Sequence, residues 1–523
     1  MITIEKMKYK VLITTSGLGS RLGDLTDYTN KSLVRVGNKP TLSYIIESYP
    51  SDTDFVITLG HYADYVKQFI EISYPNLNFE FAYVDNYSGP GSSLAYSILQ
   101  AENFLQCPFI FHPCDTILKN NEILHHTFNN VRNFCVGAKK DNTSQYTTLI
   151  TDKKKVIEIK NKGEINYDFA YTGISGIKNY KIFWKKLKNI YNSDKLNSSL
   201  FEGTVINEML KTVEFELFET KSWFDTGNTR ELEKTRKHFS TFAEVLEKKE
   251  ESIYFFDDFI IKFFADENIN KNRVNRTKFL NNLTPKIIDQ KNNFYKYEKI
   301  DGNLFAKTVN TETFKHFLNW SKKNLWLKEK HSSFKNLCYV FYVEKTLKRI
   351  DKYLKNEQEQ DQLINGVAIP KIHTLLNSID RKYLCEGIPT RFHGDFILDN
   401  ILETSNGFCL LDWRQDFAGE LIVGDMYYDL AKLNHNLTIN HEIVNKKLYN
   451  HSVDNCYILC NTTLIECKKV LKNFVIENGY DYKKVEILTS LIWINMAPLH
   501  QYPFNKFLFN FGKYNLHKAL QDE

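Results

Sequence analysis

Three polar residues in the second half of the chain have the types and the spacing that a phosphate-transfer site needs. Asp395 follows His393-Gly394, Asn400 comes five positions later, and Asp412 ends a hydrophobic run. Transfer of a γ-phosphate needs a carboxylate near the attacking hydroxyl and oxygen ligands for Mg²⁺. Asp395 can supply the first, and Asn400 and Asp412 can supply the second. A chance loop of acids and amides is the alternative, and the hydrophobic strand between Asn400 and Asp412 argues against it.

A second candidate site lies near the start of the chain, where an apolar run over residues 8–14 leads into a glycine-rich loop with Gly17 and Gly19. A strand that runs into such a loop presents backbone N–H groups at the sheet edge where α/β proteins bind phosphates. Arg21 and Lys31 follow the loop, and two fixed cations suit a triphosphate better than a dinucleotide. The third glycine and the acidic residue of a dinucleotide fingerprint are missing.

The run G-L-G-S-R-L-x-x-L-T-x-x-x-x-K-S-L over residues 17–33 resembles the nucleotidyltransferases that join a nucleoside triphosphate to a sugar phosphate or phosphocholine. The usual Ala-Ala before the first glycine is Thr15-Ser16 here, and the usual Pro before the lysine is Asn30. The resemblance covers roughly residues 8–230. It implies that Arg21 and Lys31 are catalytic and offset the charge of pyrophosphate. It also implies that Gly17, Gly19 and Ser20 contact the nucleotide.

Further motifs follow in the order that this resemblance requires. A small-residue loop over residues 85–94 contains Gly91 and Ser92, which would lie against the nucleotide base; a plain helix cap is the alternative. Asp115 ends the apolar run 109–114 and matches a metal-binding Asp, with Cys114 in place of the usual Gly. Asp225, in Trp-Phe-Asp-Thr-Gly-Asn, matches the second metal ligand. Mg²⁺ usually takes only one or two carboxylates, so this pair suffices.

The acceptor and the nucleoside triphosphate are also suggested by the resemblance. Lys160 ends the strand-like segment 156–160 and would hold the phosphate of the acceptor, although a solvated lysine is an equal alternative because Lys162 is close by. The start Thr14-Thr15-Ser16-Gly17-Leu18-Gly19 is similar to that of phosphocholine-type cytidylyltransferases, which makes CTP the first choice.

The second half, with H-G-D-x-x-x-x-N from His393 followed by a metal-binding Asp, resembles the aminoglycoside phosphotransferase and choline kinase family. In that reading Lys262, on the second strand of a hairpin over residues 252–264, contacts ATP, as does Glu298 in the lobe-joining segment 294–302. An edge strand with Lys262 in water is the alternative. Asp425 and Asp429, four apart at the start of a helix, would cap it and anchor the catalytic loop.

The residues 311–360, 371–384 and the end of the chain have a helical pattern rich in aromatic side chains. Core packing is the simpler interpretation of Phe314, Phe317, Trp320 and Trp326, and a cation–π pocket for a quaternary amine is the alternative.

These elements predict an α/β chain with two domains. Residues 1–240 would form a Rossmann-like, mostly parallel sheet with nucleotidyltransferase function, and residues 241–523 a two-lobed, protein-kinase-like α+β domain. The junction over residues 229–250 is charged and helical in period, without a Gly/Ser or Pro linker.

Composition limits the classes of function. The 523 residues are 42% hydrophobic and 25% charged, with a net charge of +5, which implies no nucleic-acid partner. The nine cysteines include no C-x-x-C pair, and an odd number argues against a disulfide framework. No apolar run of signal or membrane-spanning length occurs, so we expect a cytoplasmic protein without membrane insertion, which is free to form a homo-oligomer.

The sequence therefore predicts a bifunctional enzyme that uses ATP, CTP and Mg²⁺. It would phosphorylate a small hydroxyl acceptor (a sugar, a sugar alcohol or an amino alcohol) and convert the product into a nucleoside-diphosphate-activated precursor for capsule or surface polysaccharide. Two alternatives remain open. One is a small-molecule kinase with a non-catalytic or regulatory nucleotide-binding first domain, and the other is a nucleotide sensor without turnover.

Overall fold

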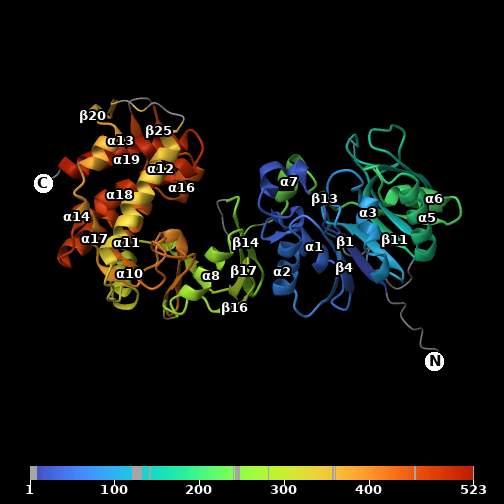
Figure 1. Ribbon diagram of the computed structural model, residues 1–523, viewed down its shortest axis with the longest axis horizontal. Helices are drawn as coiled ribbons and strands as arrows, with labels where there is room; N and C mark the ends of the chain where they lie inside the picture. Colours follow the sequence, from blue (N-terminus) through green and yellow to red (C-terminus); the bar gives the residue numbers. More distant parts are fainter. Residues whose placement is uncertain are drawn as a thin grey trace. The chain divides into compact units, whose positions relative to one another are not determined.

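The computed structural model describes residues 9–119, 132–140, 143–239, 241, 248–280, 282–355, 359, 361–452 and 455–521 (Figure 1). They form two compact units. Unit 1 comprises the chain up to Glu267 together with Ile288–Tyr297, and unit 2 comprises Asn268–Ile287 and the chain from Glu298 onward. The boundary near residue 240 separates the two expected functions and stays a prediction. In the described part of the chain, no helix combines the length and the apolar character that a membrane crossing needs.

Unit 1 is built on a nine-stranded sheet. In spatial order its strands are β5 (Asn78–Tyr83), β4 (Asp54–Leu59), β1 (Lys10–Thr14), β6 (Phe109–Pro113), β11 (Phe169–Ile177), β8 (Phe134–Ala138), β12 (Phe215–Thr220), β10 (Lys155–Lys160) and β9 (Thr148–Asp152). The ladders of β5, β4, β1 and β6 are parallel, as is the pair β8–β12, whereas β10 and β11 run opposite to the other strands. The mostly parallel α/β sheet that the sequence predicts is therefore present, with two reversed strands.

Helices cover both faces of this sheet. The unit contains α1 (Thr41–Glu47), α2 (Ala63–Ser73), α3 (Leu94–Leu99), α5 (Tyr180–Ser193), α6 (Glu202–Leu210) and α7 (Thr229–Arg236). Successive strand residues point to opposite faces. Val11 and Ile13 of β1 accordingly join the core under α1 and α2, while Leu12 joins the core under α3, α5 and α6. Burial on both faces explains the continuous apolar run at the start of the chain.

A second sheet of unit 1 contains the hairpin predicted over residues 252–264. Its strands, in spatial order, are β14 (Glu251–Phe255), β15 (Phe259–Phe264), β17 (Phe294–Glu298) and β16 (Ile287–Gln290). Tyr254 donates a hydrogen bond of 2.8 Å to the carbonyl of Leu33, and Phe69 of α2 contacts the rings of Tyr254 and Phe294. This sheet was expected to be the first lobe of the second domain. It buries its apolar face in the core of unit 1 because α2 presents a matching apolar surface.

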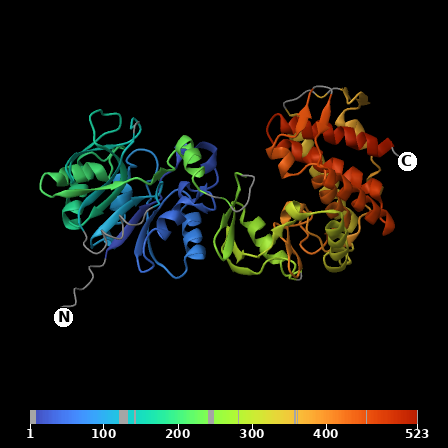
Figure 2. The ribbon, with the colours of Figure 1, turned by 180° about the vertical axis from the view of Figure 1, so that it is seen from behind.

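Unit 2 is mainly helical around one large core. Its helices are α8 (Glu267–Arg276), α9 (Phe305–Thr308), α10 (Thr311–Asn324), α11 (Phe334–Tyr339), α12 (Lys345–Leu354), α13 (Ile372–Asn377), α14 (Arg381–Cys385), α15 (Met426–Asn436), α16 (His441–Asn445), α17 (Thr462–Glu477), α18 (Tyr482–Met496) and α19 (Phe504–Gln521). Helices α18 and α19, red in Figures 1 and 2, pack side by side. A π-helical turn over Val340–Glu344 joins α11 to α12.

Short strand pairs complete both units. They are β2 (Arg35–Val36) with β3 (Lys39–Pro40), β7 (Thr116–Leu118) with β13 (Trp223–Asp225), β18 (Asn303–Leu304) with β22 (Ile401–Thr404) and β23 (Gly407–Leu410), β19 (Gln362–Ile364) with β20 (Val367–Ile369), β21 (Pro389–Thr390) with β24 (Gly424–Asp425), and β25 (Tyr449–His451) with β26 (Cys456–Ile458). The helical stretch predicted over residues 311–360 is interrupted between α10 and α11, and β25 and β26 interrupt the helical carboxyl-terminal part. Phe314, Phe317 and Trp326 are buried in the core of unit 2, as the simpler interpretation of the aromatic residues requires.

Candidate functional site

Two carboxylates that are far apart in the sequence meet at one edge of unit 1. Asp115 follows β6, and Asp225 ends β13, which pairs with β7 so that Asp225 lies opposite Thr116. The amide of Thr226 donates a 2.9 Å hydrogen bond to the carbonyl of Asp115 and locks the two segments together. A β-carbon placed on Gly227 would lie 3.0 Å from Oδ1 of Asp225 and 3.2 Å from Oδ2 of Asp115. The structure therefore brings both predicted metal ligands to one point.

The two predicted catalytic cations lie at the same point. Nζ of Lys31 is 3.3 Å from Oδ2 of Asp115, and Nη2 of Arg21 is 3.9 Å from the same oxygen. The β-carbon position at Gly227 is also only 3.3 Å from Nη2 of Arg21. The loop requires a glycine at position 19, because the φ of Gly19 is 73°, in the left-handed region, and an added β-carbon would lie 2.8 Å from Cβ of Lys31.

The pKa values of the two acids are shifted in opposite directions by their surroundings. Burial opposes ionisation of Asp115, but Lys31 and Arg21 outweigh it and hold the pKa of its carboxyl below the ordinary value. Burial raises the pKa of Asp225, and the negative charge of Asp115 adds to this rise. Asp115 is thus the member of the pair that ionises more readily. Such a pair, with Mg²⁺-compatible oxygens and two cations, can hold a phosphate–metal complex.

The unusual residues of the glycine-rich loop have structural roles. Buried Asn30 donates to the carbonyls of Thr15 (2.8 Å) and His61 (2.7 Å), and its Oδ1 accepts from the amide of Ser32 (2.9 Å). Asn30 therefore ties the ends of β1 and β4 to the turn that carries Lys31. The hydroxyl of Thr15 donates to the carbonyl of Thr58 at 2.6 Å, and that of Ser16 to Ser97 at 2.9 Å. These bonds explain why polar residues replace the usual Ala-Ala and Pro.

The two predicted nucleotide loops follow the carboxyl ends of β1 and β5, and Gly17 is partly exposed whereas Gly91 is buried. Gly17 has no atom within 4 Å of its β-carbon position, and Ser20 begins the 3₁₀ turn that contains Arg21. Gly91 has a φ of 83°, Ser92 donates to the carbonyl of Gly89 at 2.6 Å, and Ser93 caps α3. The helix cap that the alternative interpretation requires is thus present in this segment.

Two lysines other than Lys160, namely Lys162 and Lys140, interact electrostatically with the paired acids. Lys160 ends β10 and donates to the carbonyls of Ile165 (3.4 Å) and Asn166 (3.3 Å). Burial and then the charge of Arg21 lower the pKa of Lys162, while Asp115 and Asp225 raise it, so Lys162 lies within the field of the site. The region from Lys153 to Lys162 is lysine-rich, and only the fold shows which of its lysines lies close to the paired acids.

Lys140 reaches the same acids through Tyr146. The hydroxyl of Tyr146 donates to Oδ2 of Asp225 at 2.9 Å, and Nζ of Lys140 lies 3.2 Å from that hydroxyl and 3.9 Å from the ring centroid of Trp223. Burial lowers the pKa of Lys140, and Asp225 opposes the shift. The only sequence signal for Lys140 is its position just after the apolar strand β8.

A buried acid, Glu202, lies behind the sheet edge. It begins α6, its side chain is 2% exposed, and its Oε2 has no hydrogen-bond partner. Burial raises its pKa to about 8. A hydrogen bond with Tyr171 opposes this rise in the pKa of Glu202, and the charge of Asp115 adds to it. Glu202 is therefore protonated at neutral pH.

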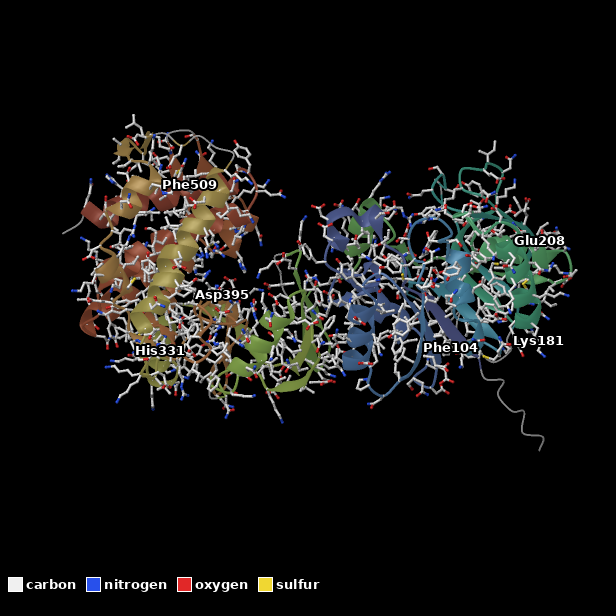
Figure 3. The ribbon with its side chains drawn as sticks, in the orientation of Figure 1. Phe104, Lys181, Glu208, His331, Asp395 and Phe509 are labelled. Atoms are coloured by element: carbon white, nitrogen blue, oxygen red, sulfur yellow. The ribbon has the colours of Figure 1, made fainter. Side chains whose placement is uncertain are left out.

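Figure 3 labels Asp395 of unit 2. The loop that carries it is held by Asp429, as the sequence predicts. The carboxylate of Asp429 accepts the amides of His393 at 2.8 Å and Gly394 at 2.7 Å. Asp425 caps α15 by accepting the amide of Tyr427 at 3.1 Å. Burial lowers the pKa of His393 to about 4, so its neutral ring is a structural part of the loop.

The buried guanidinium of Arg276 holds the other side of this loop. It donates to the carbonyls of Phe392 and Arg414, to that of His393 at 3.2 Å, and to that of Leu421 at 3.0 Å. These bonds fix the backbone of the loop, and the charge of Arg276 also lowers the pKa of Asp429.

The β22–β23 hairpin brings Asn400 and Asp412 to the same end of unit 2. The amide of Leu411 donates to the carbonyl of Asn400 at 2.7 Å and closes the hairpin. Nδ2 of Asn400 donates to the carbonyl of Asp395 at 2.9 Å and lies 3.3 Å from its Oδ2. Asp412 has a φ of 52° and forms an ion pair with Arg273 of α8. The three predicted residues therefore belong to one cluster.

Lys432 is a further member of this cluster that the sequence did not assign. Its Nζ is 2.7 Å from Oδ1 of Asp395. Burial would lower the pKa of Lys432, but Asp395 outweighs it and the pKa is raised. The two predicted ATP contacts lie elsewhere in the chain. Lys262 is buried on β15, and Oε1 of Glu298, at the end of β17, accepts the amide of Lys286 at 3.0 Å.

Comparison with known proteins bears on the first site. Residues 10–241 match the family model described as nucleotidyl transferase. A search of curated proteins finds no match. Among solved structures, a CTP:phosphocholine cytidylyltransferase from Streptococcus pneumoniae is similar to the chain at 19% identity and a TM-score of 0.38, with 44% of this chain and 99% of the other covered. An inositol-1-phosphate CTP transferase from T. maritima is similar at 14% identity and a TM-score of 0.37, with 45% of this chain and 98% of the other covered. HddC from Yersinia pseudotuberculosis, complexed with GMP-PN, is similar at 20% identity and a TM-score of 0.34, with 44% of this chain and 99% of the other covered.

Among the described residues, no group of three or more His, Cys, Asp or Glu side chains could hold a metal ion, so a metal at the first site would depend on Asp115 and Asp225 with phosphate oxygens. The paired acids, the two cations at their edge and the family match over the same segment agree: residues 10–241 carry a domain of the nucleotidyl transferase type.

Proposed function

We propose that the chain is a bifunctional enzyme. Unit 2 phosphorylates a hydroxyl of a small acceptor with ATP, and the nucleotidyl transferase domain then couples that phosphate to a nucleoside triphosphate with release of pyrophosphate. The product is a nucleoside-diphosphate-activated building block of the kind used for capsule or surface polysaccharide. The observation that carries the proposal is the convergence of Arg21, Asp115 and Asp225 on one point beside Gly227.

The nucleotidyl half-reaction needs an acceptor phosphate oxygen to attack the α-phosphorus while pyrophosphate leaves. Arg21 and Lys31 neutralise the charge that develops on pyrophosphate. Asp115 and Asp225 would hold Mg²⁺, which when bound supplies a Lewis acid to the phosphate oxygens. Asp115 fits that role because its carboxyl ionises readily beside two cations. CTP is the favoured triphosphate because of the residue 14–19 motif.

Acceptor phosphate in this site would be bound by lysines of the same edge. Lys162 and Lys140 both lie in the field of Asp225, and each has a lowered pKa that an approaching dianion would raise again. Lys160 remains a candidate from the sequence, and its contacts to two carbonyls hold the Ile165–Asn166 turn. We propose Lys162 as the principal phosphate contact.

The phosphotransfer half-reaction is assigned to the cluster around Asp395. Asp395 orients or deprotonates the acceptor hydroxyl, and Asn400 and Asp412 would hold Mg²⁺. Lys262 and Glu298 remain candidates from the sequence for contacts with ATP. The support is geometric, because the β22–β23 hairpin, Asp429 and Arg276 fix this loop from three sides.

A kinase with a non-catalytic first domain is the alternative. The close approach of both Lys31 and Arg21 to Asp115 argues against it, since a domain that only binds nucleotide has no need of two acids and two cations at one point.

The full-length protein should be incubated with Mg²⁺, ATP, each of four other nucleoside triphosphates and a panel of acceptors, and the products measured by mass spectrometry. The proposal predicts a mass for CDP joined to one acceptor. Asp395→Asn should stop phosphorylation but leave coupling of a pre-phosphorylated acceptor, and Asp115→Asn should do the reverse. The exposed acids Asp152 and Asp351, each changed to Asn, are matched controls. Loss of both activities in a folded Asp395→Asn protein would contradict two independent sites.

A further inference from the structure

A group of four basic side chains surrounds the loop of Asp395 in unit 2, and it consists of Lys345, Arg349, Arg414 and Lys432. We call it the cationic cluster. Lys345 and Arg349 are four residues apart on α12, so they share a helix face. Lys432 contacts Asp395 directly. Arg414 packs on the same loop, since a β-carbon on Gly394 would lie 2.7 Å from Cβ of Arg414.

Aromatic rings bring the members of the cluster together. Nζ of Lys345 is 3.2 Å from the ring centroid of Phe341, and Cζ of Arg414 is 5.0 Å from the same centroid. Nζ of Lys345 is also 5.6 Å from the ring of Tyr428, which precedes Lys432 by one turn of α15. The π-helical turn that ends at Glu344 sets Phe341 and Lys345 in place, and such turns are frequent at functional sites.

Among the residues that the structure describes, three of the four cations form no ion pair with a carboxylate. Within the described ranges, ion pairing to an acid is found for Lys432 but not for Lys345, Arg349 or Arg414. Arg349 donates to the carbonyl of Asn495 at 3.1 Å, and Nε of Arg414 to the carbonyl of Asp416 at 3.1 Å. Burial and the charges of the other three members lower the pKa of Lys345 well below its ordinary value. The fold thus holds several cations close together beside the reacting loop, and Asp416 is a nearby acid that opposes their effect on the pKa of Lys345.

This arrangement disfavours one class of acceptor that the sequence left open. A quaternary amine or amino alcohol would enter a positive field and would find the faces of Phe341 and Tyr428 already next to Lys345. An anionic acceptor would instead relieve the repulsion among the cations. Charge-assisted hydrogen bonds from Lys and Arg to carboxylate or phosphate oxygens are the contacts that these side chains make best.

We infer that the acceptor of unit 2 is an anionic hydroxyl compound, with a carboxylate or a phosphate group held by Lys345, Arg349 and Arg414 while its hydroxyl faces Asp395. The inference rests on the phosphotransfer proposed for unit 2. In the reaction the hydroxyl oxygen bonds to the γ-phosphorus of ATP, the bond to the β–γ bridging oxygen breaks, ADP leaves, and the hydroxyl proton passes to Asp395. The anionic group is not altered, and it binds the ground state and the transition state alike.

The test compares hydroxyl compounds of similar size that carry a neutral, an anionic or a cationic group. Glycerol, glycerate, glycerol 3-phosphate and 3-aminopropane-1,2-diol form one series, and sorbitol, gluconate, sorbitol 6-phosphate and glucosamine form another. Binding to the full-length protein is measured by calorimetry, and turnover is measured as ADP release. We expect an anionic member to bind more tightly than its neutral and cationic counterparts, and the carboxylate and phosphate arms show which anion is preferred.

Variants localise the binding to the cluster. Lys345→Met and Arg414→Met should each weaken binding of the anion and raise its KM by about ten- to a hundredfold, with kcat little changed. Lys348→Met is the matched control, because Lys348 is exposed on the same helix. Anion binding at the nucleotidyl transferase domain would not respond to these variants.

Each outcome separates the inference from the proposed kinase activity. Variant-sensitive binding of an anion without ADP release would support an anion site at the cationic cluster and refute the kinase, and with it the role of the anion as acceptor. Turnover of a neutral or cationic acceptor with a KM that Lys345→Met leaves unchanged would support the kinase and overturn the inference. The inference is also overturned if no anion in either series binds more tightly than its neutral counterpart.

Discussion

Replacing Glu202 with Gln removes a buried carboxyl whose proton should control the pH dependence of stability in unit 1. The pKa of Glu202 is raised from 4.5 to about 8 by burial. Between these values the folded state retains a proton that the unfolded state has lost, so stability falls as pH rises. The slope is at most about 1.4 kcal/mol per pH unit. From pH 6 to pH 8 the wild-type protein should therefore lose roughly 2 kcal/mol through this group.

The Gln variant keeps the shape of the side chain but cannot ionise, so its stability relative to the wild type should improve by roughly 2 kcal/mol over the same range. Hydrogen exchange of the amides of β8 and β11, corrected for intrinsic rates and read by mass spectrometry, reports on unit 1 within the whole chain. Glu208→Gln, on the exposed side of α6, is the matched control. If the pH slopes of the wild type and Glu202→Gln coincide, Glu202 is already ionised or solvated in the fold, and the burial argument fails.

Three further changes test other features of the two sites. Gly227→Ala places a methyl group 3.0 to 3.2 Å from both acids, so Mg²⁺-dependent binding of CTP should weaken about a hundredfold by calorimetry while the melting temperature stays close to that of the wild type; unchanged binding would show that nothing occupies this point. Asp429→Asn turns one acceptor of the Asp395 loop into a donor and should cost about 1–3 kcal/mol in urea unfolding of unit 2; a smaller loss than that of an exposed Asp→Asn change would remove Asp429 as the anchor. Lys432→Met leaves Asp395 without its cation and should lower kcat for ADP release about a hundredfold at an unchanged KM for ATP; an unaffected kcat would limit Lys432 to binding.

Local pattern was sufficient to predict the elements that place the first site. Arg21, Lys31 and Asp115 each lie at the end of an apolar strand or in the loop that follows one, and strand ends converge at one edge of a parallel sheet. Asp225 could be added because its Trp-x-Asp-x-Gly pattern identifies the segment. The structure brings the four side chains together without any exception.

Residues whose positions depend on tertiary packing could not be predicted in this way. Lys140, Lys162 and Lys432 have no distinctive neighbours in the sequence, and only the pairing of strands and helices shows which acids they approach. Glu202 looks like an ordinary first-turn acid until α6 is packed against the sheet. The packing of the second sheet on α2 could not be predicted either, because the apolar surface of α2 that contacts it has no local signal in the sequence.

The interleaving of the two units has a consequence for synthesis on the ribosome. The chain passes from unit 1 to unit 2 after Glu267, returns at Ile288 and leaves again after Tyr297. The strands that cover Phe69 and its neighbours on α2 are therefore not all available until β17 has emerged. At ordinary rates of elongation, the roughly fifty residues from β14 to β17 take about two to ten seconds. During that interval a nascent chain exposes an apolar helix surface, which makes it a good client for a ribosome-associated chaperone.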